Sequence, residues 1–128
     1  MSIKILLADD HEIIRKGLRS IIEKENDMEI IAETNNITDI PDLIGSVKPD
    51  IVVMEIDKPG INSSEEIKKV INMMPGIRLI CMSVYATRIM SREIIKAGAM
   101  GYIVKHRAFE ELIQAIRSVI NGKVYVCE

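Results

Sequence analysis

Short apolar runs alternate along the chain with segments in which apolar residues recur every three or four positions. Five of the runs read as buried strands, because each is too short for a helix. These runs cover residues 3–8, 29–34, 51–54, 77–82 and 100–104. Helical spacing marks residues 11–25, 38–47, 63–74, 86–97 and 109–120. Each crossover between strands therefore contains a helix, which predicts a parallel sheet with helices on both faces.

Residues at the ends of the helical segments suit those positions. Thr38 is expected to cap the second helix, and Ser63 or Ser64 the third, since their hydroxyls can accept from free backbone N–H groups. Gly98 is expected to end the fourth helix, because glycine readily adopts the left-handed conformation found there.

The composition is that of one globular domain. Of its 128 residues, 48% are apolar and 28% charged, and the net charge of −2 gives no overall attraction to nucleic acid or anionic membrane. No segment reads as a signal peptide or membrane span. Two cysteines are too few for a disulfide framework, so a cytoplasmic location is expected. We assign residues 1–122 to the domain and residues 123–128 to the start of a linker or a C-terminal tail.

Polar side chains stand where the predicted strands end. They are Asp9, Asp10, Glu55, Ser83 and Lys105. The carboxyl ends of parallel strands meet at one edge of a sheet, where open α/β sheets bind their ligands. Clustered carboxylates repel one another, and a hard divalent cation such as Mg²⁺ relieves that repulsion. The hydroxyl and the ammonium suit the oxygens of a phosphoryl group. His11, at the start of a helix, is expected to be exposed.

These motifs resemble the receiver domain of two-component response regulators. The similarity covers residues 2–122 and rests on Asp9-Asp10-His11, Glu55-x-x-x-Pro59-Gly60, Ser83 and the run from Gly98 to Lys105. These motifs most resemble those of the NarL/FixJ type, whose full-length members carry a C-terminal LuxR-type helix-turn-helix. The resemblance implies a doubly wound, flavodoxin/CheY-like fold: five parallel strands in the order 2-1-3-4-5, with five helices.

The resemblance also implies roles for individual residues. In the family, a sensor histidine kinase phosphorylates an aspartate at the end of the third strand, beside an acidic Mg²⁺ site. Asp9, Asp10 and the backbone carbonyl of Asp57 match the metal ligands. Ser83 and Tyr102 match the switch hydroxyl and the switch aromatic, and Lys105 matches the invariant lysine that binds the phosphoryl group.

The sequence departs from the family at the phospho-acceptor position. Glu55 stands there in place of aspartate, and Lys58 and Asn62-Ser63 also differ from the usual residues. The extra methylene moves the carboxylate, and in-line attack on a phosphoryl donor depends on its position. We therefore expect a pseudo-receiver that binds Mg²⁺ weakly, is not an enzyme, and signals largely without phosphorylation. The pattern does not decide whether Glu55 holds an active or an inactive arrangement.

Alternative functions remain open or can be set aside. One alternative is a Mg²⁺-dependent, phospho-accepting receiver, either stand-alone or with an effector domain. An aspartate-nucleophile phosphatase needs Asp-x-Asp after its first strand, and Asp9-Asp10-His11 lacks that spacing. No nucleotide-binding glycine motif occurs. DNA binding would belong to a C-terminal domain outside these residues, and a homodimer is compatible with the resemblance.

Overall fold

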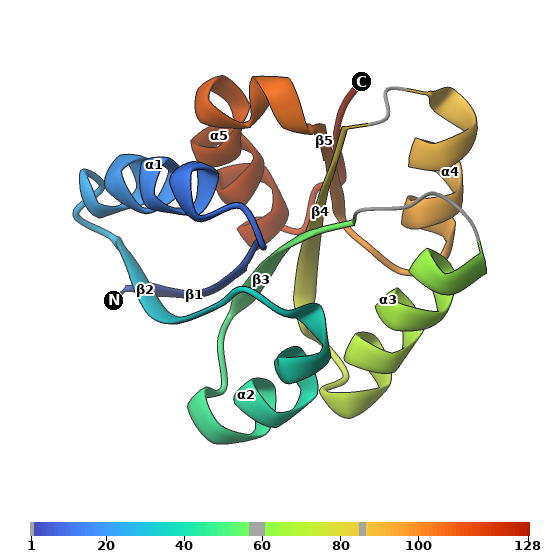
Figure 1. Ribbon diagram of the computed structural model, residues 1–128, viewed down its shortest axis with the longest axis horizontal. Helices are drawn as coiled ribbons and strands as arrows, with labels where there is room; N and C mark the ends of the chain where they lie inside the picture. Colours follow the sequence, from blue (N-terminus) through green and yellow to red (C-terminus); the bar gives the residue numbers. More distant parts are fainter. Residues whose placement is uncertain (1, 57–60, 85–86) are drawn as a thin grey trace.

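A parallel sheet forms the middle layer of the protein (Figure 1). The computed structural model describes residues 2–56, 61–84 and 87–128, with the backbone alone described for 61–63. Within these residues, six strands lie in the order β2-β1-β3-β4-β5-β6, and each neighbouring pair is parallel. The strands are β1 Ile3–Ala8, β2 Met28–Thr34, β3 Ile51–Glu55, β4 Arg78–Ser83, β5 Gly101–Val104 and β6 Tyr125–Cys127.

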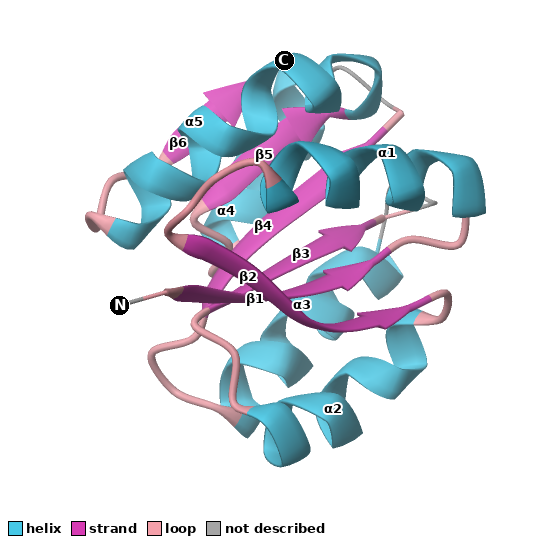
Figure 2. Cartoon of the chain, turned by 90° about the vertical axis from the view of Figure 1, so that its left-hand side faces the viewer, coloured by secondary structure: helices cyan, strands magenta, loops and turns pink. Residues whose placement is uncertain are grey.

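Helices cover both faces of the sheet (Figure 2). One face carries α1 (Glu12–Glu23) and α5 (Ala108–Ile120). The other carries α2 (Ile40–Val47), α3 (Ile61–Met73) and α4 (Arg88–Lys96). Two short 3-10 helices, η1 (Ile37–Asp39) and η2 (Lys105–Arg107), lead into α2 and α5. This doubly wound α/β arrangement confirms the predicted fold class.

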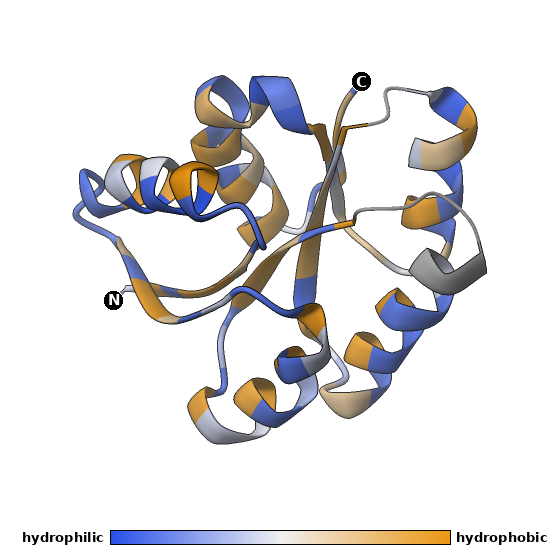
Figure 3. Cartoon of the chain, in the orientation of Figure 1, coloured by the Kyte–Doolittle hydropathy of each residue, from blue (hydrophilic) through white to orange (hydrophobic). Residues whose placement is uncertain are grey.

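Two hydrophobic cores lie on opposite sides of the sheet because successive side chains of a strand point to opposite faces. Leu7 and Val53 pack on the side of α1 and α5, whereas Leu6 and Val52 pack on the side of α2, α3 and α4. The strands are largely hydrophobic, while the helices mix hydrophobic and hydrophilic residues (Figure 3). Burial of each such aliphatic side chain contributes about 1.5–3 kcal/mol. The cores therefore fix the strands whose ends carry the polar cluster.

The prediction of five strands is wrong by one. Residues 125–127 were expected in a linker or tail, but they form β6, which pairs with β5. The Tyr125 N–H donates to the Met100 carbonyl over 2.9 Å. Beyond the strand, the Ser91 hydroxyl of α4 donates to Glu128 over 2.7 Å. A three-residue strand is too short to show a period of two, and it forms because the edge of β5 offers it hydrogen-bond partners.

Helix ends differ from expectation in two places. The Asn36 side chain accepts from the Thr38 N–H, so Asn36 caps the helical segment and Thr38 lies inside it. Helix α3 begins at Ile61, before the expected caps Ser63 and Ser64. Both errors arise because several short polar side chains compete near one helix start. Gly98 follows α4 with a φ of 122°, as its expected role requires.

Candidate functional site

Strand register brings three buried, charged side chains to one edge of the sheet. Asp9 follows β1, Glu55 ends β3, and Lys105 follows β5. Pairing of Ala8 with Met54, of Glu55 with Met82, and of Ser83 with Val104 keeps these strand ends level. The side chains of Asp9, Glu55 and Lys105 are 0%, 4% and 7% exposed. The structure therefore brings together three of the five side chains that were predicted to converge at the carboxyl edge.

Lys105 joins the two buried carboxylates. Its Nζ forms a direct ion pair with Glu55 Oε2 and lies 3.2 Å from Asp9 Oδ1. A buried charge is tolerated only when a partner and hydrogen bonds replace the water it has lost. The lysine is thus the internal counter-charge of the site. Removing it would leave two buried carboxylates unpaired, at a large cost in free energy.

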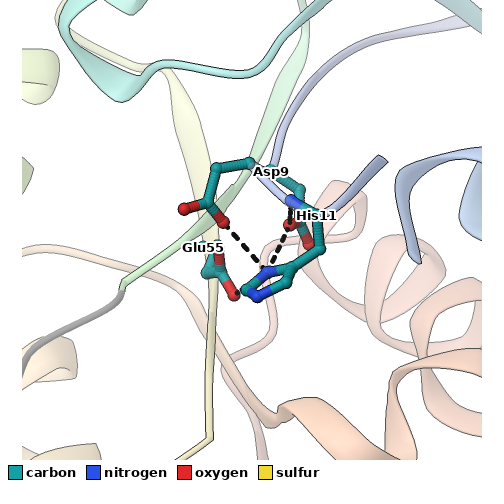
Figure 4. Close-up of side chains that lie close together, drawn as sticks. Asp9, His11 and Glu55 are labelled. Carbon is teal, nitrogen blue, oxygen red and sulfur yellow. Dashed lines mark hydrogen bonds and ion pairs between the residues drawn. The ribbon is translucent and has the colours of Figure 1, made fainter. Parts of the chain in front are cut away.

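His11 enters the same cluster, which the sequence did not predict. Its ring is 57% exposed, as expected, yet the imidazole Nδ1 lies 2.7 Å from Lys105 Nζ. Nδ1 also lies 2.9 Å from Asp10 Oδ1, 3.2 Å from Glu55 Oε2 and 3.3 Å from Asp9 Oδ1. The carboxylates of Asp9 and Glu55 point toward the imidazole (Figure 4). The ring therefore places a nitrogen inside the cluster.

Backbone contacts hold this end of β1 in place. The His11 N–H donates to Asp9 Oδ1 over 2.7 Å, a local turn typical of aspartate before a helix. Arg15 Nη1 of α1 donates to the Asp9 carbonyl over 2.6 Å, while its Nε pairs with Glu33 of β2 at 3.2 Å. The role of Arg15 was not predicted, since an arginine on a helix face carries no signal of its partner.

A cavity of about 140 Å³ opens beside the cluster. Its lining combines cluster residues with the loop that follows β2: Asp9, Asp10, Glu55, Asn35, Asn36 and Ile37. The contribution of this loop was missed, because its polar residues read as an ordinary connection. Asp9 Oδ2 is buried without a hydrogen-bond partner among the described residues. The cavity thus has an acidic wall with unused acceptor capacity.

Ser83 and Tyr102 lie on the side of the sheet that faces α4. Ser83 ends β4 and is buried, and its hydroxyl contacts Met90 Sδ of α4 at 3.8 Å. Tyr102 is fully buried in the core of that side. Burial raises the pKa of the Tyr102 phenol, and a hydrogen bond with Ser83 opposes part of that rise. The two predicted switch residues are therefore neighbours in the structure.

The remaining predicted ligand, the backbone carbonyl of Asp57, lies outside the described residues, as do Lys58, Pro59 and Gly60. Asp9, Asp10, His11 and Glu55 each offer a ligand atom, and these atoms lie within 4.8 Å of one another. Such a set suits a divalent cation, because carboxylate oxygens and an imidazole nitrogen are common metal ligands.

Comparison with known proteins agrees with this architecture. Residues 5–117 match the family described as the response regulator receiver domain. The response regulator GacA of Pseudomonas aeruginosa is 31% identical over 97% of this chain and 58% of its own length. The uncharacterised transcriptional regulatory protein YxjL of Bacillus subtilis is 33% identical over 94% of this chain and 56% of its own length. The chain thus spans just over half of these curated relatives.

A solved structure has the same fold. A two-component response regulator of the LuxR family from Aurantimonas superposes with a TM-score of 0.88. It is 29% identical, and the match covers 98% of this chain and 89% of that one. Among the described residues, the longest and most apolar helices still fall short of what a bilayer crossing requires.

Proposed function

Because this chain belongs to the response regulator receiver domain family, we propose that it is a pseudo-receiver of the LuxR type, a signalling module that works largely without phosphorylation of residue 55. The observation that carries the proposal is the buried ion pair between Glu55 and Lys105. In the family, by the resemblance of the sequence, an aspartate at this position accepts the phosphoryl group and the lysine binds it. Here a carboxylate of the chain itself already engages the lysine.

The chemistry of the acceptor position supports this proposal. Glutamate is one methylene longer than aspartate, which moves the carboxylate by about the length of a C–C bond and adds one torsion to fix. A displacement of about 1 Å at a reacting atom can slow a reaction on the order of a hundredfold. In addition, Glu55 Oε2 would have to leave Lys105 before attacking a donor. We propose that the chain is not an enzyme and at most transfers a phosphoryl group to itself slowly.

Magnesium binding is proposed to be weak. Asp9 and Asp10, with the backbone carbonyl of Asp57, would be the ligands. Mg²⁺ held by these residues would supply positive charge for the oxygens of a phosphoryl group. However, the ammonium of Lys105 already pairs with Asp9 and Glu55, which reduces the electrostatic gain from a hard cation.

The relatives support a proposal for the wider function. YxjL is a transcriptional regulatory protein, and the Aurantimonas protein is a LuxR-family response regulator. We propose that this chain is the regulatory part of such a transcription regulator, with DNA contacted by a C-terminal domain beyond these residues. A sensor histidine kinase and a second copy of the chain are the corresponding proposed partners.

Intact-mass measurement tests the proposal. The wild type and Glu55→Asp are incubated with Mg²⁺ and acetyl phosphate, with Glu55→Gln as the control that lacks a nucleophile. We expect no added phosphate on the wild type and a labile phosphate on Glu55→Asp. A phosphate on the wild type but not on Glu55→Gln would instead establish a working receiver with an unusual acceptor. Phosphate on neither the wild type nor Glu55→Asp would mean that residues other than residue 55 also prevent phosphotransfer.

A further inference from the structure

We propose that the outer edge of β6 and the neighbouring face of α4 form a docking surface for an extended, acidic segment of a partner protein. The groove between these two elements has a volume of about 450 Å³. Side chains of both elements line it, among them Arg88, Arg92, Ile95, Lys96, Val126 and Glu128. The described linings of this α4/β6 groove and of the cavity beside Asp9 have no residue in common, and the inference does not depend on the chemistry of residue 55.

The first argument is the open edge of the sheet. β6 is the last strand in the order, and no described strand lies on its outer side (Figure 2). The Tyr125 N–H donates inward, to the Met100 carbonyl that precedes β5. Alternate residues of a strand form hydrogen bonds to opposite sides, so the N–H and C=O of Val126 point away from β5. An extended segment can use these two groups to add a further strand.

The second argument is the apolar part of the groove. Val126 pairs with Tyr102, and the Tyr102 side chain packs in the core on the side of α4. Paired residues of neighbouring strands share a face of the sheet, so the Val126 side chain also faces α4. It is 44% exposed, and the partly buried Ile95 of α4 lines the same groove. A docked strand would cover apolar surface on both elements.

The third argument is charge. Arg88, Arg92 and Lys96 recur at intervals of four residues, so one face of α4 presents three cations to the groove. Glu128 is the one carboxylate in the described lining, and it lies 3.9 Å from Arg88. Neither Arg92 nor Lys96 has an ion-pair partner among the described residues. The groove is therefore basic in a chain with a net charge of −2, and it suits an anionic occupant.

The fourth argument is spacing. Residues four apart on a helix are separated by about 6 Å along its axis. Alternate residues of a strand are separated by about 6.6 Å. Acidic side chains at every second position of an extended segment therefore match the successive cations of α4. Such a segment would bind Val126 with its backbone and α4 with one face of its side chains.

Two other occupants fit these observations less well. A second copy paired antiparallel at β6 would bring two basic faces of α4 to the same side of a joint sheet, where like charges repel. A nucleic acid would offer phosphates to the cations. However, it has no backbone amide edge with which to continue the strand pairing of Val126. An acidic peptide satisfies both the cations and the edge.

Fluorescence anisotropy tests the proposal with a labelled peptide, Glu-Val-Glu-Thr-Glu-Val-Glu, and a matched peptide that carries lysine in place of glutamate. We expect the glutamate peptide to bind and the lysine peptide not to bind. Arg92→Glu should weaken binding roughly tenfold or more, because it replaces an attraction with a repulsion. Lys16→Glu makes the same charge change on the exposed surface of α1 and should bind as the wild type does.

Hydrogen exchange of single amides, followed by NMR, tests the use of the edge. The Val126 N–H should exchange more slowly with the glutamate peptide bound, whereas the Tyr125 N–H, already bonded to Met100, serves as the reference. The proposal is overturned if the peptide does not bind, if Arg92→Glu and Lys16→Glu bind it equally, or if exchange at Val126 does not change.

The same measurements separate the other occupants. Tighter binding of an oligothymidylate of equal charge would assign the groove to nucleic acid and overturn the proposal. A wild-type dimer in which the Val126 N–H is already protected from exchange would assign the edge to a second copy, which also overturns it.

Discussion

Lys105 and Glu55 form an ion pair that joins the ends of β5 and β3 inside the protein. The pair lies at the position where a receiver domain, by resemblance, carries its acceptor and its lysine. The pair holds the ends of these two strands together from within the sheet. It gives the proposed pseudo-receiver a physical basis that can be tested through stability as well as through phosphorylation.

Replacing Lys105 with Met should lower the free energy of unfolding by about 3–5 kcal/mol, because Glu55 and Asp9 would stay buried without their counter-charge. Urea denaturation measures the change. Adding Glu55→Gln to this variant should recover part of the loss. Lys16→Met is the control, since Lys16 pairs with Glu12 on the exposed surface of α1 and should matter little. Equal losses in Lys105→Met and Lys16→Met would contradict the buried-pair argument.

Gly98 and Gly45 should respond in opposite directions to substitution by alanine. Gly98 has a φ of 122°, and a Cβ there would overlap Ile71 Cδ1, so Gly98→Ala should destabilise the protein by more than about 1 kcal/mol. Gly45 lies inside α2, and a Cβ built on it would meet no atom within 4 Å apart from its chain neighbours and its own helix backbone, so Gly45→Ala should stabilise by about 0.5–1 kcal/mol. Thermal unfolding of both variants tests these two predictions. A loss of stability in both variants would refute the prediction of opposite effects.

Tyr125 should make the protein sensitive to high pH. Burial, followed by the hydrogen bond to the Glu111 carboxylate, raises the pKa of the phenol from 10.0 to about 12. The folded state then holds this proton more tightly than the unfolded state. The stabilisation is complete below about pH 10 and is lost as the pH rises toward 12.

Tyr125→Phe isolates that effect. The variant should lack one tyrosinate transition with a midpoint near 12, measured by absorbance. Its stability should also fall less steeply than that of the wild type between about pH 10 and 12. Identical pH profiles for the two proteins would show that the phenol of Tyr125 titrates normally.

Cys81 should resist alkylation in the folded protein. It is fully buried in the middle of β4, and this burial raises the pKa of its thiol far above the ordinary value. The reactive thiolate is therefore scarce and inaccessible. Iodoacetamide at mildly alkaline pH, followed by peptide mass mapping, should modify Cys81 only after denaturant is added. Modification of Cys81 under native conditions, at the rate of a free thiol, would contradict the packing of the sheet.

The fold was largely predictable because its main elements carry strong periodic signals. Buried parallel strands such as β3 read as continuous apolar runs, and their order along the chain requires crossover helices. The residues at the strand ends followed from that topology, which explains why Asp9, Glu55 and Lys105 were placed together correctly. The strand β6 escaped prediction because its three residues form a strand only against the edge of β5.

The detailed geometry of the cluster was not predictable in the same way. The direction of the His11 ring depends on the turn made by Asp9. It also depends on the position of Lys105, which is distant in sequence. Arg15 reaches the Asp9 carbonyl across one turn of α1, and no sequence pattern marks such a contact. The sequence position of a residue at a helix start shows which edge of the sheet it lies near. The direction of its side chain depends on tertiary contacts.

The contact between Ser91 and Glu128 links the end of the sixth strand to the fourth helix, although the strand follows the fifth helix in the chain. The C-terminal residues are thereby tethered to an element more than thirty positions earlier. Any rigid-body shift of α4 would pull on this tether or release it. The position of α4 and the position of the residues that follow β6 are thus coupled through this hydrogen bond.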